Sequence, residues 1–199
     1  MLRPFEDMDR DPFFALNTHP LVVESLGSAP TRAESDDMIE RYSAEMVREG
    51  WGLWAVGEGA VGAAGGGAAG AAFVGMVGLH RVRPEMPCAP AVEIGWRLHP
   101  DFWGRGYATE AAAAALRFGF EEAGLTEIVA FTTTLNTRSQ AVMARIGMRR
   151  DVDGDFDHPS VPEGSPLRRH VLYRATEGGG DGGGDGTVAG SHSSPTVAS

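Results

Sequence analysis

A glycine-rich turn joins a predicted strand directly to a long alanine-rich helix, and this junction constrains the fold more than any other feature of the sequence. The strand is expected over residues 91–98 and the helix over 107–123, with Gly124 at its end. Gly104 and Gly106 in the turn would let backbone N–H groups approach a ligand, and the helix N-terminus favours an anion such as pyrophosphate. An ordinary turn before a helix would show the same residues.

The remaining pattern indicates a mixed sheet with helices, an α+β or α/β domain. The helix expected over 32–49 begins with Thr31 and Glu34 as a capping box and ends at Gly50. Another helix is expected over 7–18. Hydrophobic alternation and turn residues predict the other elements. These are strands over 51–56, 73–82, 127–133, 148–152 and 169–174, and a short helix over 136–146.

Length and composition favour one working domain, expected over residues 1–175. All 17 basic residues are arginine, and 27 acidic residues bring the net charge to -10, which disfavours binding to nucleic acid. The single Cys88 fits a reducing compartment, and the acidic N-terminus shows no signal peptide, so a cytoplasmic protein is expected. Residues 176–199 are rich in Gly, Asp and Ser and are expected to be a disordered tail.

The uncharged stretch over residues 60–79 raises two alternatives that the residues argue against. Its length would suit a membrane span, but fourteen of its twenty residues are Gly or Ala, so we expect a loop over 60–72 that enters a strand. Residues 65–70 also match the dinucleotide pattern G-x-G-x-x-G. That pattern requires a following helix, and the strand expected next disfavours a Rossmann domain.

Two motifs carry a resemblance to a known family. The run Glu93–Pro100, followed by Trp103–Ala111, closely resembles the acetyl-CoA-binding core of the GNAT superfamily of N-acetyltransferases. Gly106 and Ala108 match the signature of Gln or Arg, two residues, Gly, one residue, then Gly or Ala. Trp103 stands where Gln or Arg is usual, and tryptophan there is common in the branch that includes the ribosomal-protein N-terminal acetyltransferases.

The second motif follows in the expected order. It is similar to the family's Asn, a Ser three residues later, and a Gly before a large apolar residue, here Asn136, Ser139, Gly147 and Met148. Weaker similarity lies near both ends, so the resemblance covers residues 2–175. It implies a GNAT-like, mixed, mostly antiparallel central sheet that is flanked by helices and splayed at the acetyl-CoA site.

The resemblance also implies which residues bind acetyl-CoA, the co-substrate of a direct acyl transfer to an amine. Free backbone groups of the strand from Trp96 to Leu98 would pair with the pantetheine arm, and Asn136 would reach this arm from the other side. The turn would hold the pyrophosphate, through Gly104, Arg105, Gly106, Ala108 and Thr109. Asn136 could instead simply cap the helix that follows.

The catalytic roles carry alternatives as well. Glu93 is the candidate base, or else a solvent-facing or ion-paired strand glutamate. Ser139 is the candidate proton donor to the thiolate, or else a local backbone partner in the first helical turn. His158, beside Asp157, is the candidate acceptor contact, or else surface turn chemistry. His80 and His170 have no spacing partners for a metal and receive no role.

The expected activity is acetylation of a primary amine, with a protein N-terminal α-amine favoured by the branch. The alternatives are a small-molecule amine or antibiotic as acceptor, and a module that binds acyl-CoA without turnover. We expect a monomer or homodimer with no metal, nucleic acid or membrane partner.

Overall fold

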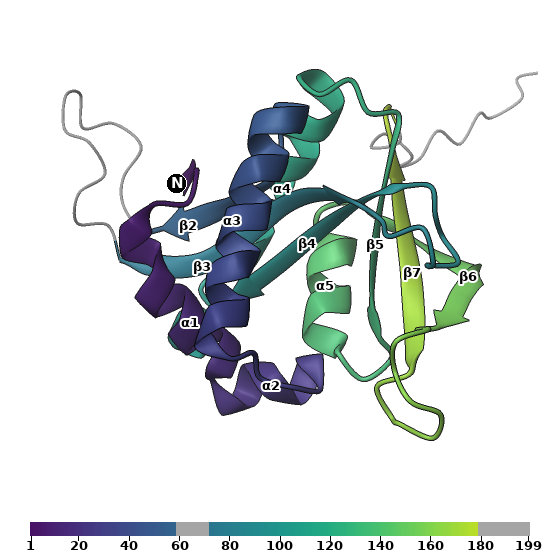
Figure 1. Ribbon diagram of the computed structural model, residues 1–199. Helices are drawn as coiled ribbons and strands as arrows, with labels where there is room; N and C mark the ends of the chain where they lie inside the picture. Colours follow the sequence, from purple (N-terminus) through teal and green to yellow (C-terminus); the bar gives the residue numbers. More distant parts are fainter. Residues whose placement is uncertain (59–71, 179–199) are drawn as a thin grey trace, which may run out of the picture.

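The structure, a computed structural model, describes residues 1–58 and 72–178, and one mixed sheet organises them. The strand order is β1-β2-β3-β4-β5-β7-β6, and every neighbouring pair is antiparallel except β4 and β5, which are parallel (Figure 1). The strands are β1 (Leu2–Arg3), β2 (Leu53–Gly57), β3 (Phe73–Arg81), β4 (Val92–Leu98), β5 (Glu127–Thr133), β6 (Arg149–Asp157) and β7 (Arg169–Thr176). The predicted mixed, mostly antiparallel sheet is therefore confirmed.

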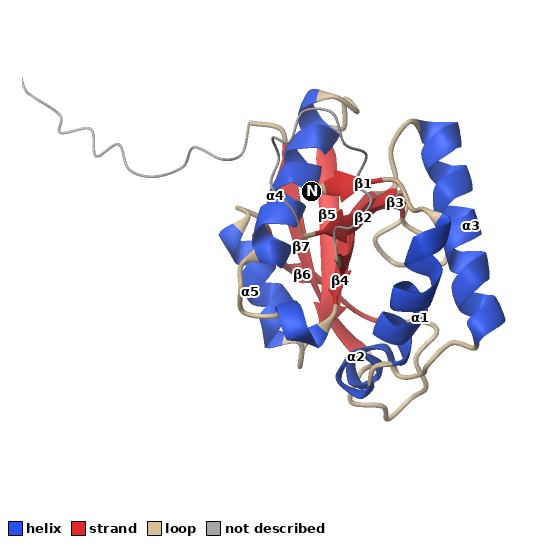
Figure 2. Ribbon diagram, turned by 90° about the vertical axis from the view of Figure 1, so that its left-hand side faces the viewer, coloured by secondary structure: helices blue, strands red, loops and turns tan. Residues whose placement is uncertain are grey.

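Helices cover both faces of this sheet. Figure 2 shows α4 and α5 on one face and α1, α2 and α3 on the other. The helices are η1 (Asp7–Asp9), α1 (Arg10–Thr18), α2 (Pro20–Leu26), α3 (Arg32–Glu49), η2 (Pro100–Phe102), α4 (Tyr107–Glu121) and α5 (Thr137–Arg145). The predicted capping box begins α3, and Gly50 ends it at a φ of 77°. None of the described helices is both long enough and apolar enough to cross a membrane.

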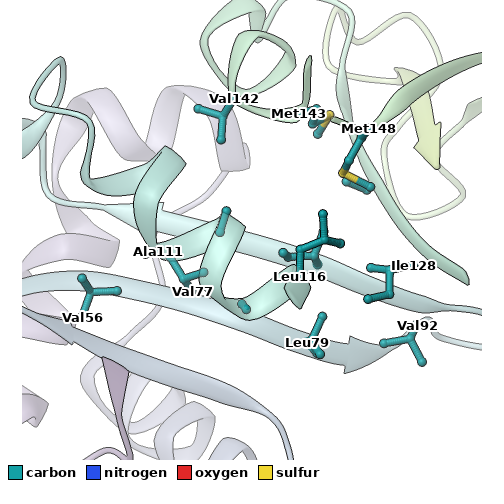
Figure 3. Packing of buried hydrophobic residues seen from close by; sticks show 14 of the residues in the cluster. Val56, Val77, Leu79, Val92, Ala111, Leu116, Ile128, Val142, Met143 and Met148 are labelled. Carbon is teal, nitrogen blue, oxygen red and sulfur yellow. The ribbon is translucent and has the colours of Figure 1, made fainter. Parts of the chain in front are cut away.

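The main hydrophobic core lies between the sheet and the pair α4 and α5. Val77, Leu79 and Ile128 from the sheet meet Leu116 of α4 and Met143 of α5 in one buried cluster (Figure 3). The small alanines of α4 let this helix approach the sheet closely. At Gly119 an added Cβ would lie 2.5 Å from Cδ1 of Ile128, so a larger residue would require that side chain to move.

The N-terminal third differs from the sequence-based expectation in three places. The helix expected over 7–18 is divided into η1 and α1 at Asp9, whose carboxylate is held by Arg3. Helix α2 was not predicted, although it begins with Pro20 and ends at Gly27, both ordinary helix boundary signals. The two-residue β1 is too short to show an alternating pattern.

The C-terminal strands extend beyond their expected ends. β6 continues to Asp157 instead of ending at 152, with an irregular register between Asp151 and Phe156. Few of the β6 side chains are buried, so its sequence is mostly polar and lacks the hydrophobic alternation that predicts a strand. β7 continues to Thr176, one residue beyond the expected end of the domain. Most of the loop expected over 60–72 and most of the tail expected over 176–199 lie outside the described residues.

Candidate active site

The parallel strands β4 and β5 separate after a single point of pairing. Glu93 pairs with Val129, and no further pair between these strands occurs in the part of the chain that the structure describes, whereas β4 pairs with β3 along its whole length. The divergence of β4 from β5 is visible in Figure 1. The expected splay of the sheet is therefore present, and it opens toward Leu98.

The hydrogen-bond pattern of β4 decides which backbone groups face the gap. The N–H of His99 donates to the carbonyl oxygen of Val74, and the N–H of Val82 donates to the carbonyl oxygen of Ala91, both with an N···O distance of 2.9 Å. Because bonding alternates along an antiparallel pair, the even-numbered residues of β4 direct their N–H and C=O groups toward β5. Trp96 and Leu98, both predicted to bind the pantetheine arm, are among them.

Trp103 ties the following turn to the end of this strand. Its indole Nε1 donates to the Leu98 carbonyl at 2.8 Å, so one of the two predicted backbone contacts of Leu98 is already engaged within the protein. The guanidinium of Arg138, in the first turn of α5, lies 4.6 Å from the centre of the Trp103 ring. The tryptophan that departs from the signature thus links β4, the turn and α5.

The turn presents unpaired backbone N–H groups at the start of α4. Gly104 and Gly106 have φ angles of 76° and 89°, and a Cβ at either position would meet no atom within 4 Å. The first helical bond runs from Glu110 N to Gly106 O at 3.0 Å. The N–H groups of residues 107–109 therefore have no partner among the described residues, and with the helix dipole they suit a phosphate or pyrophosphate.

Asn136 and Ser139 lie at the start of α5, where Asn136 is the N-cap residue. The Asn136 side chain caps the helix, since its Oδ1 accepts from Ser139 N at 3.1 Å. Ser139 is half-buried, and its hydroxyl makes no hydrogen bond within residues 1–58 and 72–178. Capping is therefore confirmed for Asn136, while its contact with the co-substrate stays a prediction.

Glu93 is paired with a histidine that the sequence did not identify. His80 lies directly opposite on β3, and its Nε2 is 3.3 Å from Glu93 Oε2. The Glu93 side chain is only 13% exposed, and burial raises its pKa to about 8. Burial also lowers the pKa of His80. Both directions favour a neutral pair near pH 7.

The tautomer of His80 follows from its second contact. Its Nδ1 lies 3.3 Å from the Arg81 carbonyl oxygen, which can only accept, so Nδ1 carries the proton. Nε2 then offers a lone pair to Glu93, whose protonated carboxyl donates. His80 thus holds the carboxyl in one orientation. Only the cross-strand register brings these two residues together, and their separation of thirteen positions in sequence gave no signal.

His158 lies in a buried cluster of rings on the face of the sheet that carries Glu93. Its ring centre is 5.0 Å from that of His170, which in turn stacks on Phe156 at 5.7 Å. His170 pairs with Thr133, four residues beyond the partner of Glu93 on β5, so these side chains share one face. Burial lowers the pKa of both histidines. That His80 and His170 bind no metal stays a prediction.

Comparison with known families identifies the family to which this chain belongs. Residues 1–149 match the family model described as an acetyltransferase (GNAT) domain. The chain belongs to the GNAT acetyltransferase family. The splayed strands and the glycine turn are therefore the GNAT fold that the two sequence motifs predicted.

Relatives and solved structures agree with this assignment. The chain is 40% identical over 84 residues to FsC-acetyl coenzyme A-N(2)-transacetylase of Aspergillus fumigatus, a match covering 42% of this chain and 35% of that protein. It is 42% identical over 85 residues to the N-acetyltransferase YnaD of Bacillus subtilis, covering 43% and 48%. These matches span about a third to a half of the relatives. A GNAT-family acetyltransferase structure from Bacillus anthracis superposes with a TM-score of 0.68 at 26% identity, covering 88% and 93% of the two chains.

The role of the GNAT turn can be tested by replacing Gly106 with alanine. Gly106→Ala puts a side chain on a backbone with a φ of 89°, which costs about 1–2 kcal/mol, and places its Cβ where an anion would approach. We expect the dissociation constant of acetyl-CoA, measured by calorimetry, to rise about tenfold or more.

Gly50→Ala is the matched control for this substitution. Gly50 has a φ of 77° and equally open surroundings, but it ends α3. We expect Gly50→Ala to lower the melting temperature about as much as Gly106→Ala and to leave acetyl-CoA binding unchanged. Equal losses of affinity in the two variants would show that the turn has no special role.

Proposed function

We propose that this chain transfers an acetyl group from acetyl-CoA to a primary amine. The observation that carries the proposal is the gap between β4 and β5, which leads from Glu93 directly to the anion-binding start of α4. The backbone of Trp96 and Leu98 would hold the pantetheine arm. Gly104, Gly106 and the free N–H groups after them would hold the pyrophosphate, with Arg105 and Arg138 as nearby cations.

The side chains around the gap supply the proton transfers. Acetyl-CoA supplies the acetyl thioester; a bond forms between the amine nitrogen and the acetyl carbon, and the carbon–sulfur bond breaks. Glu93 accepts the proton that the amine loses, directly or through water, and His80 acts as a positioning residue that orients the carboxyl. Ser139 donates its hydroxyl proton to the departing thiolate and regains a proton from solvent water, and Glu93 releases the amine proton to solvent, so both groups return to their starting states. With a pKa of about 8, Glu93 is mostly protonated near pH 7, and the deprotonated form that accepts the amine proton increases as the pH rises toward 8.

The branch resemblance favours a protein N-terminal α-amine as acceptor. The single Cys88 favours a reducing compartment, and the cytoplasm is the proposed site of action. The name of the Aspergillus fumigatus relative, which specifies transfer to an N(2) position, supports N-acetylation without identifying an acceptor for this chain. His158, half-buried against His170 on the face of the sheet that carries Glu93, is the proposed acceptor contact.

The proposed function is tested by offering acetyl-CoA with a peptide library and a panel of small amines. Free thiol release measures turnover, and mass spectrometry identifies the acetylated product. We expect thiol release that depends on the amine. Acetyl-CoA binding without thiol release for any amine would favour a non-catalytic module, and a failure to bind acetyl-CoA would overturn both interpretations. Acetylation of small amines alone would reject the ribosomal-protein branch.

A further inference from the structure

Arg97 is a half-buried cation without an acidic partner among the described residues. It follows Glu93 by four residues on β4, and its Nη1 donates to the side-chain oxygen of Asn17 on α1. It takes part in no ion pair within the described part of the chain. Burial lowers the pKa of Arg97, because desolvation disfavours the charged form. A guanidinium in such surroundings is strongly stabilised by an anion.

Asn17 holds this guanidinium in place. Asn17 is fully buried, and its Nδ2 donates to the Phe13 carbonyl at 2.9 Å, which fixes the amide so that its oxygen faces Arg97. Since Asn17 occupies only one of the guanidinium nitrogens, the others remain available to a ligand. The contact with Asn17 of α1 therefore fixes the orientation of the Arg97 guanidinium.

Arg97 contributes to the lining of an open groove of about 560 Å³, within the usual range for a small-ligand site. The groove lies between the connection from α2 to α3 and one face of α3. Glu34, on its rim, is already engaged in the capping box, since it accepts from Thr31 N at 2.7 Å. Arg41 and Asp37, both on α3, add one positive and one negative charge to the lining, so Arg97 is the cation held at the base of a groove of mixed charge. The other lining residues are Leu26, Ser28, Ala29, Pro30 and Met38.

The position of Arg97 relative to Glu93 fits a ligand with two functional groups. Residues 93 and 97 point to the same face of β4, and their Cα atoms are about 13 Å apart. We propose that the acceptor is a primary amine that also carries a carboxylate, with the amine toward Glu93 and the carboxylate on Arg97. This inference rests on the proposed function and names its substrate class. A polyamine would place an ammonium group against Arg97 and is therefore disfavoured.

Matched acceptors test this inference on the full chain. 5-Aminovalerate and 6-aminohexanoate are compared with their amides, and peptides with Glu at the second position are compared with peptides with Gln. We expect kcat/KM to be at least about tenfold higher for the acid of a pair. A preference for the acid among the small amines identifies a small-molecule acceptor. A preference for the acid that is confined to the peptides identifies an acidic protein N-terminus. Equal kcat/KM for acid and amide in both arms would overturn the inference.

Variants then attribute the preference to Arg97. Arg97→Gln should remove the preference for the acid by raising the KM of the acid, while the kcat of the acid and both constants of the amide stay nearly constant. Arg97→Lys should restore part of this preference. Arg117→Gln, at an exposed position on α4, should retain the full preference. An unchanged preference in Arg97→Gln would overturn the inference, and so would its loss in Arg117→Gln.

The wild-type data separate this inference from the proposed function. Thiol release with amides but no preference for acids refutes carboxylate recognition alone. Absence of thiol release with every acceptor refutes acetyl transfer, and the inference with it. Because the comparison of acids with amides uses the wild-type chain, it stands even where Arg97→Gln fails to fold.

Discussion

Glu93→Gln is expected to lower kcat about 100-fold or more while the affinity for acetyl-CoA changes little. Glutamine has nearly the same shape as glutamate but cannot accept a proton, and residue 93 lies at the closed end of the gap, away from the glycine turn before α4. In the wild type, kcat/KM should rise with pH up to the Glu93 pKa of about 8, because the base must be deprotonated. Thiol release measured from about pH 6 to pH 10 checks both expectations.

The same substitution changes the pH dependence of stability. Because the folded-state pKa of Glu93 is raised to about 8 from an ordinary value near 4.5, the folded protein binds more protons than the unfolded chain between these two values. The contribution of Glu93 to the free energy of unfolding is therefore greatest at low pH and is lost as pH rises through about 8. Relative to the wild type, Glu93→Gln should become more stable across this window.

Glu121→Gln serves as the control for both measurements. Glu121 is 64% exposed on α4, and its contact with Arg117 is a weak 3.9 Å ion pair. Its replacement should leave turnover and the pH dependence of stability unchanged. If Glu93→Gln retained full turnover at every pH, Glu93 would not be the base.

The second large effect is expected for Asp9→Asn, which should lower the free energy of unfolding by about 3–5 kcal/mol. Arg3 and Asp9 form a buried, two-point ion pair, with Nη1 to Oδ2 at 2.6 Å and Nη2 to Oδ1 at 2.7 Å. The same carboxylate accepts from Glu6 N at 2.8 Å. Asparagine keeps the volume but leaves a buried guanidinium without a counter-charge. Denaturant-induced unfolding measures the loss.

Asp7→Asn is the matched control in the same helical turn. Asp7 is 95% exposed and pairs with Arg10 at 3.2 Å, so its replacement should cost no more than about 1 kcal/mol. The double replacement Arg3→Met with Asp9→Leu should be less destabilising than Asp9→Asn, since no unpaired charge remains. A loss in Asp9→Asn no larger than in Asp7→Asn would contradict the role of the buried pair.

Local patterns were sufficient for the elements that present regular signals. Helix α3 was predicted from its caps at Thr31 and Gly50, and β5 from its β-branched residues, with bounds that the structure confirms. Helix α2 and the second half of β6 were missed, because seven residues are too few for a helical period and the β6 side chains are too exposed for alternation.

The sequence by itself determined the mixed sheet, the glycine turn before α4 and, through two motifs, the GNAT family. These features are local in the chain, so hydrophobic periodicity, capping residues and glycine positions are enough to reveal them. Only the tertiary structure decided that His80 orients Glu93, that Arg138 lies over Trp103, and that Asn17 holds Arg97 beside a groove. These contacts join residues 13, 35 and 80 positions apart, and they depend on strand register, helix docking and burial, which no local pattern specifies.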